Sequence, residues 1–415
     1  MNQNNKNKTI MYVVSYFPST SQTFVLREIT HLKSLGFQLK ICALKSSSQE
    51  IKQHGTEAFM DAVNYIPDVA SDKTKLFSLL TTNLLLGLKR PAKYLKAVIK
   101  ALSSGNFKIL LDLLKAGWAV QHLKLDKNIH LHAQFAHNPT NVAYFISLLN
   151  DNSISFTSHA VDIFVNPQLI KEKLERSKFA VTISKFNYNL LEKTYGKQSV
   201  ENLHVIRCGI EKNLVNEQVN NSLNKPDQPI SILTIGRMVE KKGFDILVDA
   251  LKLLKDNGYN FTCNIVGDGG LNDELVKRVR DSHLLDHVNF LGALPSSDIQ
   301  NEFKRADMFV LPCKEAENGD MDGIPVVLME AIANYVPVVT TELSGIPELI
   351  IDQQTGLLAK PNDSISLYEK ISSLIKHPEI KTDLTKKAAE HLKQEFLLES
   401  NVERLAELMK KQLVS

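Results

Sequence analysis

The sequence predicts an α/β protein made of two parallel-sheet domains. Short apolar, β-branched runs alternate with longer helical patterns along most of the 415 residues, which is typical of parallel strands covered by helices. This series stops at a polar stretch rich in Asn, Gln, Lys and Pro, residues 211–229, and starts again directly after it. The composition, 43% hydrophobic and 23% charged, is that of a globular protein. We therefore expect two domains of similar size, each with its own core.

The expected domains are an N-terminal domain at 1–212, a linker at 213–229, a C-terminal domain at 230–390 and a C-terminal helix at 391–415. The first series predicts strands at 9–17, 37–44, 129–134, 154–157, 179–183 and 204–207, and a helix at 24–35 that stops at Gly36. The second predicts strands at 230–235, 260–266, 288–291, 308–311 and 336–340, and a helix at 244–257. Residues 386–414 predict one or two amphipathic helices.

Charge and composition exclude several classes of protein. The net charge of +3 argues against a sequence-independent nucleic-acid binder, so no nucleic-acid partner is expected. The two halves differ, with net +12 for residues 1–210 and −9 for 211–415, which indicates different partners. The N-terminus is polar and no apolar run is long enough to span a membrane, so we expect a cytoplasmic protein. The four cysteines match no zinc-ligand spacing, and no metal site is expected.

Ligands of open parallel sheets bind beyond the carboxyl ends of the strands, so the loops there are the candidate sites. The loop at 17–23 has no GxGxxG pattern, which argues against a dinucleotide-binding dehydrogenase. The later loop GRMVEKKGF lacks the ending of a P-loop, but it holds Arg237 and Lys242 five positions apart, flanked by Gly236 and Gly243. Two cations and a helix N-terminus there would suit a diphosphate, and a solvated basic turn is the alternative.

The segment at 306–341 combines a strand, an acidic loop and a short helix that we expect to open at Pro325. The free amides of the first turn would then face a bound anion; they belong to Gly323, Ile324, Val326 and Val327. Asp322 before the helix and Glu330 inside it are eight positions apart, and carboxylates of this kind suit sugar hydroxyls. The glycine turn at 266–270 is a weaker candidate for contact with a base or a phosphate.

An ordered set of motifs resembles one enzyme family over nearly the whole chain. The motifs are GRMVEKKGFDIL, IVGDGGL, FLGALP, ADMFVLP, DGIPVVLMEA, PVVTTELSGIPELI and TGLLAKP. The chain resembles the retaining glycosyltransferases of sequence family 4, in particular bacterial members that build capsular and extracellular polysaccharides. The resemblance implies the GT-B fold, with two Rossmann-like domains facing a cleft and a C-terminal helix that returns to the N-terminal domain. It also implies metal-independent, retaining transfer from a nucleotide-diphosphate sugar, with UDP favoured over GDP, to a glycan or polyprenyl-diphosphate-linked acceptor.

The resemblance also implies roles for single residues. Arg237 and Lys242 match the pair that neutralises the donor diphosphate, and Glu330 matches the acid that holds the nucleotide ribose. Asp322 matches an acid that contacts the donor sugar; the commoner residue is Glu, whose extra methylene adds about 1.5 Å of reach, so this departure bears on sugar identity. His159 matches a histidine beside the transferred sugar, with a packed structural histidine as the alternative. The remaining donor-binding candidates are Gly236, Gly267, Leu294, Gly323, Ile324, Pro325, Val326 and Val327.

The first loop departs from the family, because Ser21, Gln22 and Thr23 stand where many relatives carry a glycine pair. These three residues, with His137, are candidates for acceptor or phosphate binding. His132 and His137 flank a strand end and would suit a metal, but no carboxylate or cysteine completes the set, which favours a structural or acceptor role.

Other interpretations stay open at this point. The triplet Asp320-Met321-Asp322 resembles a metal-binding pattern of a different glycosyltransferase fold, although it occurs late in the chain, where a chance match is favoured. A sugar-nucleotide epimerase or phosphorylase, or an inactive binding subunit, would share the fold. Residues 76–124 hold eight basic side chains and one acid among apolar residues, which fits either an anionic membrane surface or ordinary helices packed on a sheet.

Overall fold

The computed structural model describes residues 9–19, 23–46, 55–69, 72, 74–216 and 228–414. The chain forms two compact units. Unit 1 comprises Met1–Ile183, Asn187–Ile206 and Val402–Ser415, and unit 2 comprises Ser184–Phe186 and Arg207–Asn401. Most of the predicted linker, residues 217–227, lies outside the described residues, and the domain boundaries proposed from the sequence stay a prediction.

In the described part of unit 1, seven parallel strands form one sheet in the order β3-β2-β1-β4-β5-β6-β7. The strands are β1 (Thr9–Phe17), β2 (Leu39–Ser46), β3 (Val63–Tyr65), β4 (Ile129–Gln134), β5 (Ile154–Ser158), β6 (Phe179–Thr182) and β7 (Leu203–Val205). The helices are α1 (Thr23–Ser34), α2 (Thr74–Lys89), α3 (Pro91–Ser103), α4 (Phe107–His122), α5 (Asn138–Asn150), α6 (Val161–Phe164), α7 (Ile170–Arg176) and α8 (Lys185–Tyr195), the last of which starts in unit 2. Both β4 and β5 are buried along their whole length, as expected for central strands covered on both faces.

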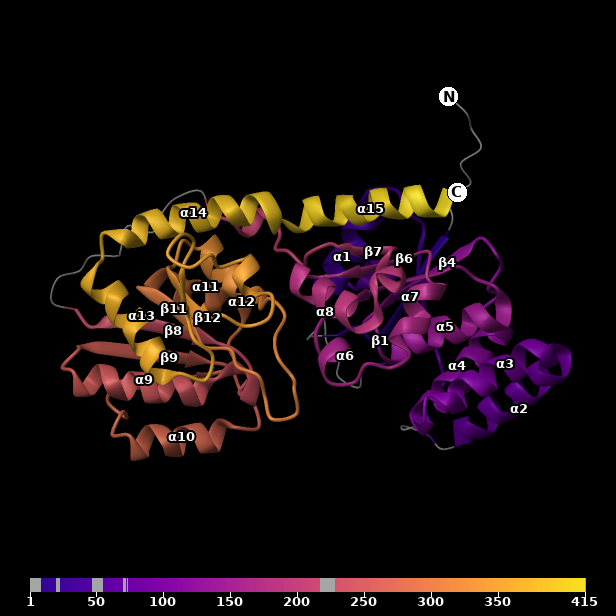
Figure 1. Ribbon diagram of the computed structural model, residues 1–415, viewed down its shortest axis with the longest axis horizontal. Helices are drawn as coiled ribbons and strands as arrows, with labels where there is room; N and C mark the ends of the chain where they lie inside the picture. The colour runs from indigo at the N-terminus through magenta and orange to yellow at the C-terminus, as the bar shows by residue number, and fades with distance from the viewer. Residues whose placement is uncertain are drawn as a thin grey trace, which may run out of the picture. The chain divides into compact units, whose positions relative to one another are not determined.

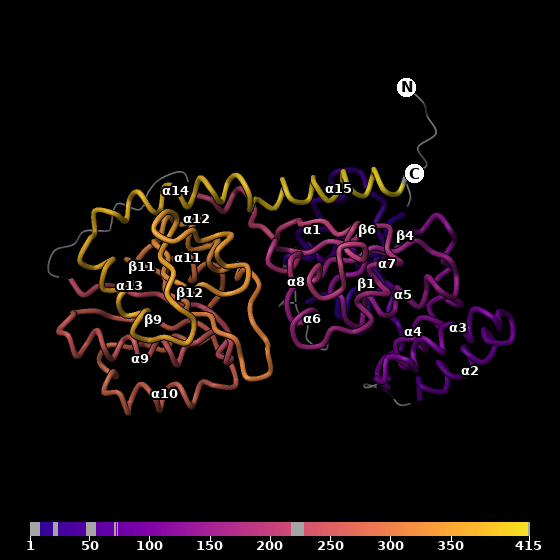
Figure 2. Tube along the Cα trace, in the orientation of Figure 1, coloured from indigo at the N-terminus to yellow at the C-terminus, as the bar shows by residue number. Residues whose placement is uncertain are grey.

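Unit 2 holds a second parallel sheet, with six strands among the described residues in the order β10-β9-β8-β11-β12-β13. The strands are β8 (Ile230–Ile235), β9 (Phe261–Val266), β10 (Val288–Gly292), β11 (Met308–Leu311), β12 (Val338–Thr341) and β13 (Leu357–Ala359). The helices are α9 (Phe244–Asp256), α10 (Asn272–Asp281), α11 (Ser296–Arg305), α12 (Val326–Ala333), α13 (Ser364–Lys376) and α14 (Ile380–Glu395). Figure 2 shows α9 and α10 on one face of this sheet and α11, α12 and α14 on the other. Two separate apolar clusters fill the two faces.

The two-sheet α/β architecture confirms the fold predicted from the sequence, and the long strands lie where the apolar runs placed them. The edge strands β3 and β13 were not predicted, because each has only three residues, too few to show the length or alternation of a strand. The residues at 386–414 form two helices, the end of α14 and then α15 (Leu398–Val414). As expected, the C-terminal helix ends in unit 1, where Lys410 Nζ lies 5.6 Å from the centre of the Phe37 ring.

The strand order defines one switch point in each sheet, where connections leave in opposite directions. In unit 1 the switch point lies between β1 and β4, and in unit 2 it lies between β8 and β11. Ligands of open parallel sheets bind beyond the carboxyl ends of the two strands at such a point. The topology therefore directs attention to the loops that follow these four strands.

Candidate donor and sugar sites

Two loops of unit 2 meet at its switch point. The first, Gly236–Gly243, follows β8, and the second, Pro312–Pro325, follows β11. The second loop donates backbone hydrogen bonds to the first, from Lys314 to the Lys241 carbonyl and from Glu317 to the Glu240 carboxylate, both at 3.0 Å. These bonds fix the acidic loop against the basic loop before any ligand is considered.

Asp322, on the acidic loop, lies between two lysines of the basic loop. Its Oδ2 is 2.6 Å from Lys242 Nζ, and its Oδ1 is 3.3 Å from Lys241 Nζ. Burial alone would raise the pKa of Asp322, but the charges of Lys242 and Lys241 hold it below its ordinary value. Burial likewise opposes the charge on Lys242, and the charge of Asp322 raises the pKa of that lysine. At neutral pH this is a part-buried pair of opposite charges held in fixed positions.

The Arg237 side chain is exposed and forms no hydrogen bond or ion pair with another residue in the described part of the chain. It lies near enough to Lys242 for its charge to lower the pKa of that lysine slightly. Two cations that repel each other at one loop are stabilised by a ligand with two negative groups. The structure thus brings together three of the predicted residues, Arg237, Lys242 and Asp322.

The short helix α12 presents free amides at the same loop. It begins at Val326, so the prediction that Pro325 is its first residue was wrong by one position; Pro325 is the N-cap, with ψ of 125°. A set of four amides donates no hydrogen bond to another described residue: Gly323, Ile324, Val326 and Val327. Helix N-terminal amides of this kind favour anions. Glu330 lies in the second turn of α12.

Two further predicted donor residues pack against this region. Gly267, after β9, has φ of +132°, and a Cβ there would lie 2.0 Å from the Gly236 carbonyl oxygen, so only glycine fits this approach of two loops. Leu294, after β10, is partly buried against the same apolar cluster as Ile324. These contacts show how Gly236, Gly267 and Ile324 are positioned, while their donor-binding roles stay predictions.

In unit 1 the predicted catalytic residue is His159, which follows β5 and is 7% exposed. Its ring packs on Phe24 and Phe135, with centroids 4.9 and 4.4 Å away. The buried Asp162 carboxylate accepts hydrogen bonds from the backbone amides of His159 and Ala160 and so fixes the turn. Burial lowers the pKa of His159 to about 3. The ring is therefore neutral at pH 7 and serves as a hydrogen-bonding or packing group.

A buried chain of polar side chains leads from His159 to the first helix, and sequence reasoning missed it. His159 Nε2 lies 3.0 Å from Gln134 Oε1, Gln134 Nε2 donates to Glu28 Oε1 at 2.7 Å, and the Tyr12 hydroxyl donates to the same oxygen at 2.8 Å. Because the amide oxygen of Gln134 can only accept, Nε2 is the protonated nitrogen of His159. A sequence signal was available, because Glu28 stands in the apolar stripe that Val25, Ile29 and Leu32 form on α1.

Glu28 gives the unit a pH dependence that can be measured. Burial raises its pKa from 4.5 to about 7, although the hydrogen bonds from Tyr12 and Gln134 act in the opposite direction. Between pH 4.5 and about pH 7, Glu28 is protonated more often in the folded state than in the unfolded state. The free energy of unfolding therefore falls as the pH rises through this range. We expect Glu28→Gln to raise the melting temperature relative to wild type more at pH 8 than at pH 5.

Thermal unfolding at both pH values measures this difference, with Glu403→Gln, an exposed carboxyl on α15, as the matched control. An equal shift at pH 5 and pH 8 for Glu28→Gln would show that the carboxyl does not titrate in this range.

Of the other predicted residues of unit 1, the structure describes the side chains of His132 and His137. His132 is fully buried, hydrogen-bonds through its two ring nitrogens to Ser155 and Thr157, and has its pKa lowered to about 3 by burial, as a structural histidine would. His137 stacks on Phe135, and its Nδ1 is buried without a partner among the described residues. Ser21 and Gln22 lie outside the described residues, as does the side chain of Thr23, the first residue of α1.

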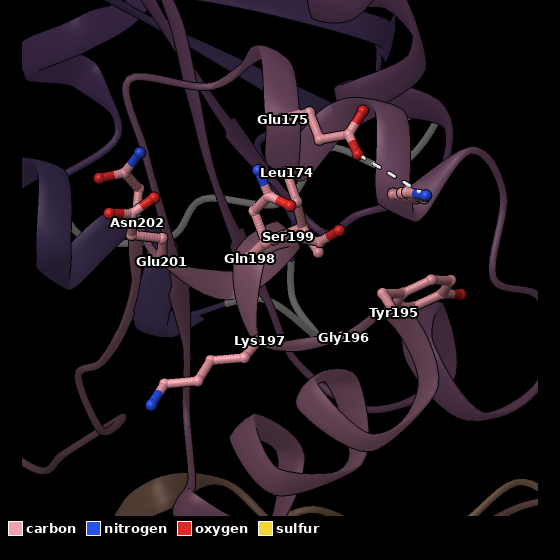
Figure 3. Close-up of a pocket in the computed structure, with 10 residues that line it drawn as sticks. Leu174, Glu175, Tyr195, Gly196, Lys197, Gln198, Ser199, Glu201 and Asn202 are labelled. Carbon is pink, nitrogen blue, oxygen red and sulfur yellow. Dashed lines mark ion pairs between the residues drawn. The ribbon is translucent and has the colours of Figure 1, made fainter.

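The rest of the described structure adds no donor or acceptor site. Within the described ranges, no three His, Cys, Asp or Glu side chains gather as a metal centre, and no helix is long and apolar enough to cross a membrane. A pocket of about 510 Å³ in unit 1 is lined by residues that include Lys171, Glu175, Tyr195 and Asn202 (Figure 3). It lies beside α7 and the residues just before β7, away from the carboxyl ends of the strands.

Comparison with known proteins agrees with this geometry. Residues 215–391 match the family described as glycosyl transferases group 1. The chain is 29% identical over 369 residues to the amylovoran biosynthesis glycosyltransferase AmsK of Erwinia amylovora, covering 86% of this chain and 88% of AmsK. Among solved structures it is similar to a glycosyltransferase from Rickettsia africae, with 19% identity, a TM-score of 0.71 and coverage of 98% and 99%. It is also similar to Anabaena HepE solved with UDP, with 16% identity, a TM-score of 0.68 and coverage of 97% and 100%.

The family match covers the two loops that hold Arg237, Lys242 and Asp322, and the structural similarity extends over both sheets. This chain is a glycosyltransferase with the GT-B fold, and its residues 215–391 match the family of glycosyl transferases group 1.

Proposed function

We propose that the chain is a retaining, metal-independent hexosyltransferase of bacterial surface polysaccharide synthesis. It would move a sugar from a nucleotide-diphosphate sugar, UDP-linked in preference to GDP-linked, to a glycan or polyprenyl-diphosphate-linked acceptor. The observation that carries the proposal is the group of Lys242, Arg237 and free α12 amides at the switch point of unit 2. AmsK, named for amylovoran biosynthesis, and HepE, solved with UDP, support the substrate classes.

The proposed chemistry needs charge stabilisation at a leaving diphosphate. As the bond between the sugar C1 and the diphosphate oxygen stretches, negative charge grows on that oxygen, and cations fixed in advance stabilise it most in the transition state. Lys242 and Arg237 would supply these cations, and the amides of Val326 and Val327 would add partial positive charge.

Retention follows if the acceptor oxygen bonds to C1 from the face that the diphosphate leaves. The acceptor hydroxyl proton would pass to an oxygen of the departing phosphate, so no enzymic nucleophile is required. Asp322 and Glu330 would accept hydrogen bonds from sugar and ribose hydroxyls. Neutral His159 would lie beside the transferred sugar and donate no charge of its own to the reaction.

The contacts of the acidic loop support the metal-independent mechanism. Lys241 Nζ lies 3.0 Å from Asp320 Oδ2 and 3.3 Å from Asp322 Oδ1, so a lysine occupies the position between the two carboxylates of the Asp-x-Asp triplet. A divalent ion bound by both would have to displace this cation.

The acceptor proposal places the protein in the cytoplasm, with peripheral binding to the inner face of the plasma membrane. A polyprenyl-linked acceptor lies in that membrane, and the basic N-terminal half, with net charge +12, would favour its anionic surface.

A transfer assay in EDTA tests the proposal. Purified protein is incubated with UDP- and GDP-hexoses and with a polyprenyl-diphosphate-linked saccharide, and the product is examined by ¹H NMR. We expect release of nucleoside diphosphate that requires the acceptor, with the donor's anomeric configuration retained. An inverted product would contradict the retaining mechanism, and an altered sugar formed without acceptor would indicate an epimerase or phosphorylase.

A further inference from the structure

Helices α2 and α3 form an outer layer of unit 1. They connect β3 with β4, pack against each other and against α4, and lie beyond α4 at the edge of the unit (Figure 1). Their inner faces are buried, through Leu79, Leu86 and the polar Thr82 and Asn83 on α2 and through Ala97 and Ala101 on α3. The inner faces alone account for the packing of these helices in the unit.

The outer faces are apolar as well, which packing on α4 does not explain. On α2 an exposed row repeats at helical spacing, with Phe77, Leu84 and Leu88 at 74, 68 and 73% exposure. On α3 a second exposed row contains Leu95 and Ile99. Of the 18 large apolar side chains exposed in the described part of the chain, ten lie between residues 76 and 107. Exposed apolar surface concentrated in this way marks an interaction site.

The charged residues around these rows are basic. No Asp or Glu occurs at residues 74–111, and the one acid of residues 76–124, Asp112, is buried and hydrogen-bonded by Asn138 and Asn141. Lys93 and Lys100 pair with acids of neighbouring segments. On and beside the outer rows, Lys89, Lys96 and Lys108 are exposed and form no ion pair with another described residue.

We propose that the outer face of α2 and α3 docks on the surface of an anionic lipid bilayer. The apolar rows would enter the boundary between headgroups and acyl chains, and Lys89 and Lys96 would bind lipid phosphates. A second copy of this chain fits less well, because a two-fold contact would pair two copies of this face, and residues 74–111 carry basic side chains and no acid on either copy. The inference rests on the proposed function, because a membrane-bound protein would meet its lipid-linked acceptor at the bilayer surface. Lipid binding itself is measured without donor or acceptor.

Vesicle flotation of the full chain without nucleotide tests the proposal. Wild type is expected to float with phosphatidylglycerol-containing vesicles at low salt and much less with pure phosphatidylcholine. The double variant Leu84→Asp/Leu88→Asp, and separately Lys89→Gln/Lys96→Gln, should each lower partitioning about tenfold or more. The matched control is Leu285→Asp/Ile365→Asp, which changes two exposed apolar residues of unit 2, 57% and 62% exposed, and should float like wild type.

The fluorescence of Trp118, the single tryptophan, and the melting temperature show whether each variant keeps unit 1 folded. Wild type that stays in solution at low salt, or folded variants that float equally well, would overturn the proposal. So would a concentration-dependent dimer in sedimentation that Leu84→Asp/Leu88→Asp abolishes, because that result assigns the face to a second copy. A protein that floats but transfers no sugar would leave this proposal standing and contradict the proposed function.

Discussion

Replacing Lys242 with methionine is expected to lower kcat for sugar transfer about 10²–10³-fold, the effect of losing one fixed donor at a developing negative charge. Methionine keeps much of the length and apolar packing of the lysine stem but removes the ammonium 2.6 Å from Asp322. The loss should fall on kcat more than on KM, because the charge on the leaving diphosphate is greatest in the transition state. Steady-state kinetics with saturating acceptor measures both parameters.

Two controls separate this effect from general damage. Lys252→Met removes a lysine of α9 that pairs with Asp256 on the surface, and its kinetics should match wild type. Asp322 keeps Lys241 as a partner in the Lys242→Met variant, so unit 2 should still fold, and circular dichroism checks this. A folded Lys242→Met enzyme with kcat within a few-fold of wild type would exclude this lysine as the cation of the leaving group.

Gly243→Ala is expected to destabilise unit 2 and abolish nucleotide binding together. Gly243 has φ of +67°, and a Cβ there would lie 1.9 Å from the carbonyl oxygen of Pro312. The left-handed conformation alone costs an alanine about 1–2 kcal/mol. The overlap of the new Cβ with the Pro312 backbone adds to this cost. It is relieved only if the acidic loop moves away from the basic loop, and that movement separates Asp322 from Lys242. Melting temperature and nucleotide titration measure the two effects.

Gly258→Ala is a closely matched comparison. Gly258 also has positive φ, +81°, at the other end of α9, but a Cβ there meets no heavy atom within 4 Å. This variant should show the conformational cost only and bind nucleotide like wild type. Equal losses of melting temperature and of nucleotide binding in the two variants would mean that the close approach of Gly243 to Pro312 does not hold the basic loop against the acidic loop.

Sequence patterns predicted the sheets because β1, β8 and β11 consist mainly of apolar residues, as burial on both faces favours, and β4 alternates Ile, Leu and Ala with His and Gln. The start of α12 was placed one residue early because proline is compatible with both the N-cap and the first turn, and the backbone of Pro325 decides between them. Short edge strands such as β13, which has three residues, are too short to show a periodic pattern.

The candidate site was predictable as a set of residues but not as a set of contacts. Lys242 and Asp322 are 80 positions apart, and they meet because β8 and β11 are neighbours at the switch point, which no local pattern contains. The position of Lys241 between Asp320 and Asp322 depends on the same pairing. Glu28 was overlooked because its partners, Tyr12 and Gln134, come from two strands that are adjacent only in the folded sheet.

The metal-free diphosphate site of unit 2 is tested most directly by calorimetric titration of UDP, GDP and ADP in EDTA against wild type and Arg237→Ala. The Arg237 side chain is exposed and has no hydrogen-bond or ion-pair partner in the described part of the chain, so its removal should leave the fold intact. We expect one nucleotide to bind wild type without metal, and Arg237→Ala to weaken that binding about tenfold or more, the scale of a lost charge-assisted hydrogen bond. Binding only after Mn²⁺ is added would contradict a metal-free diphosphate site and assign the anion site to a metal held by Asp320 and Asp322.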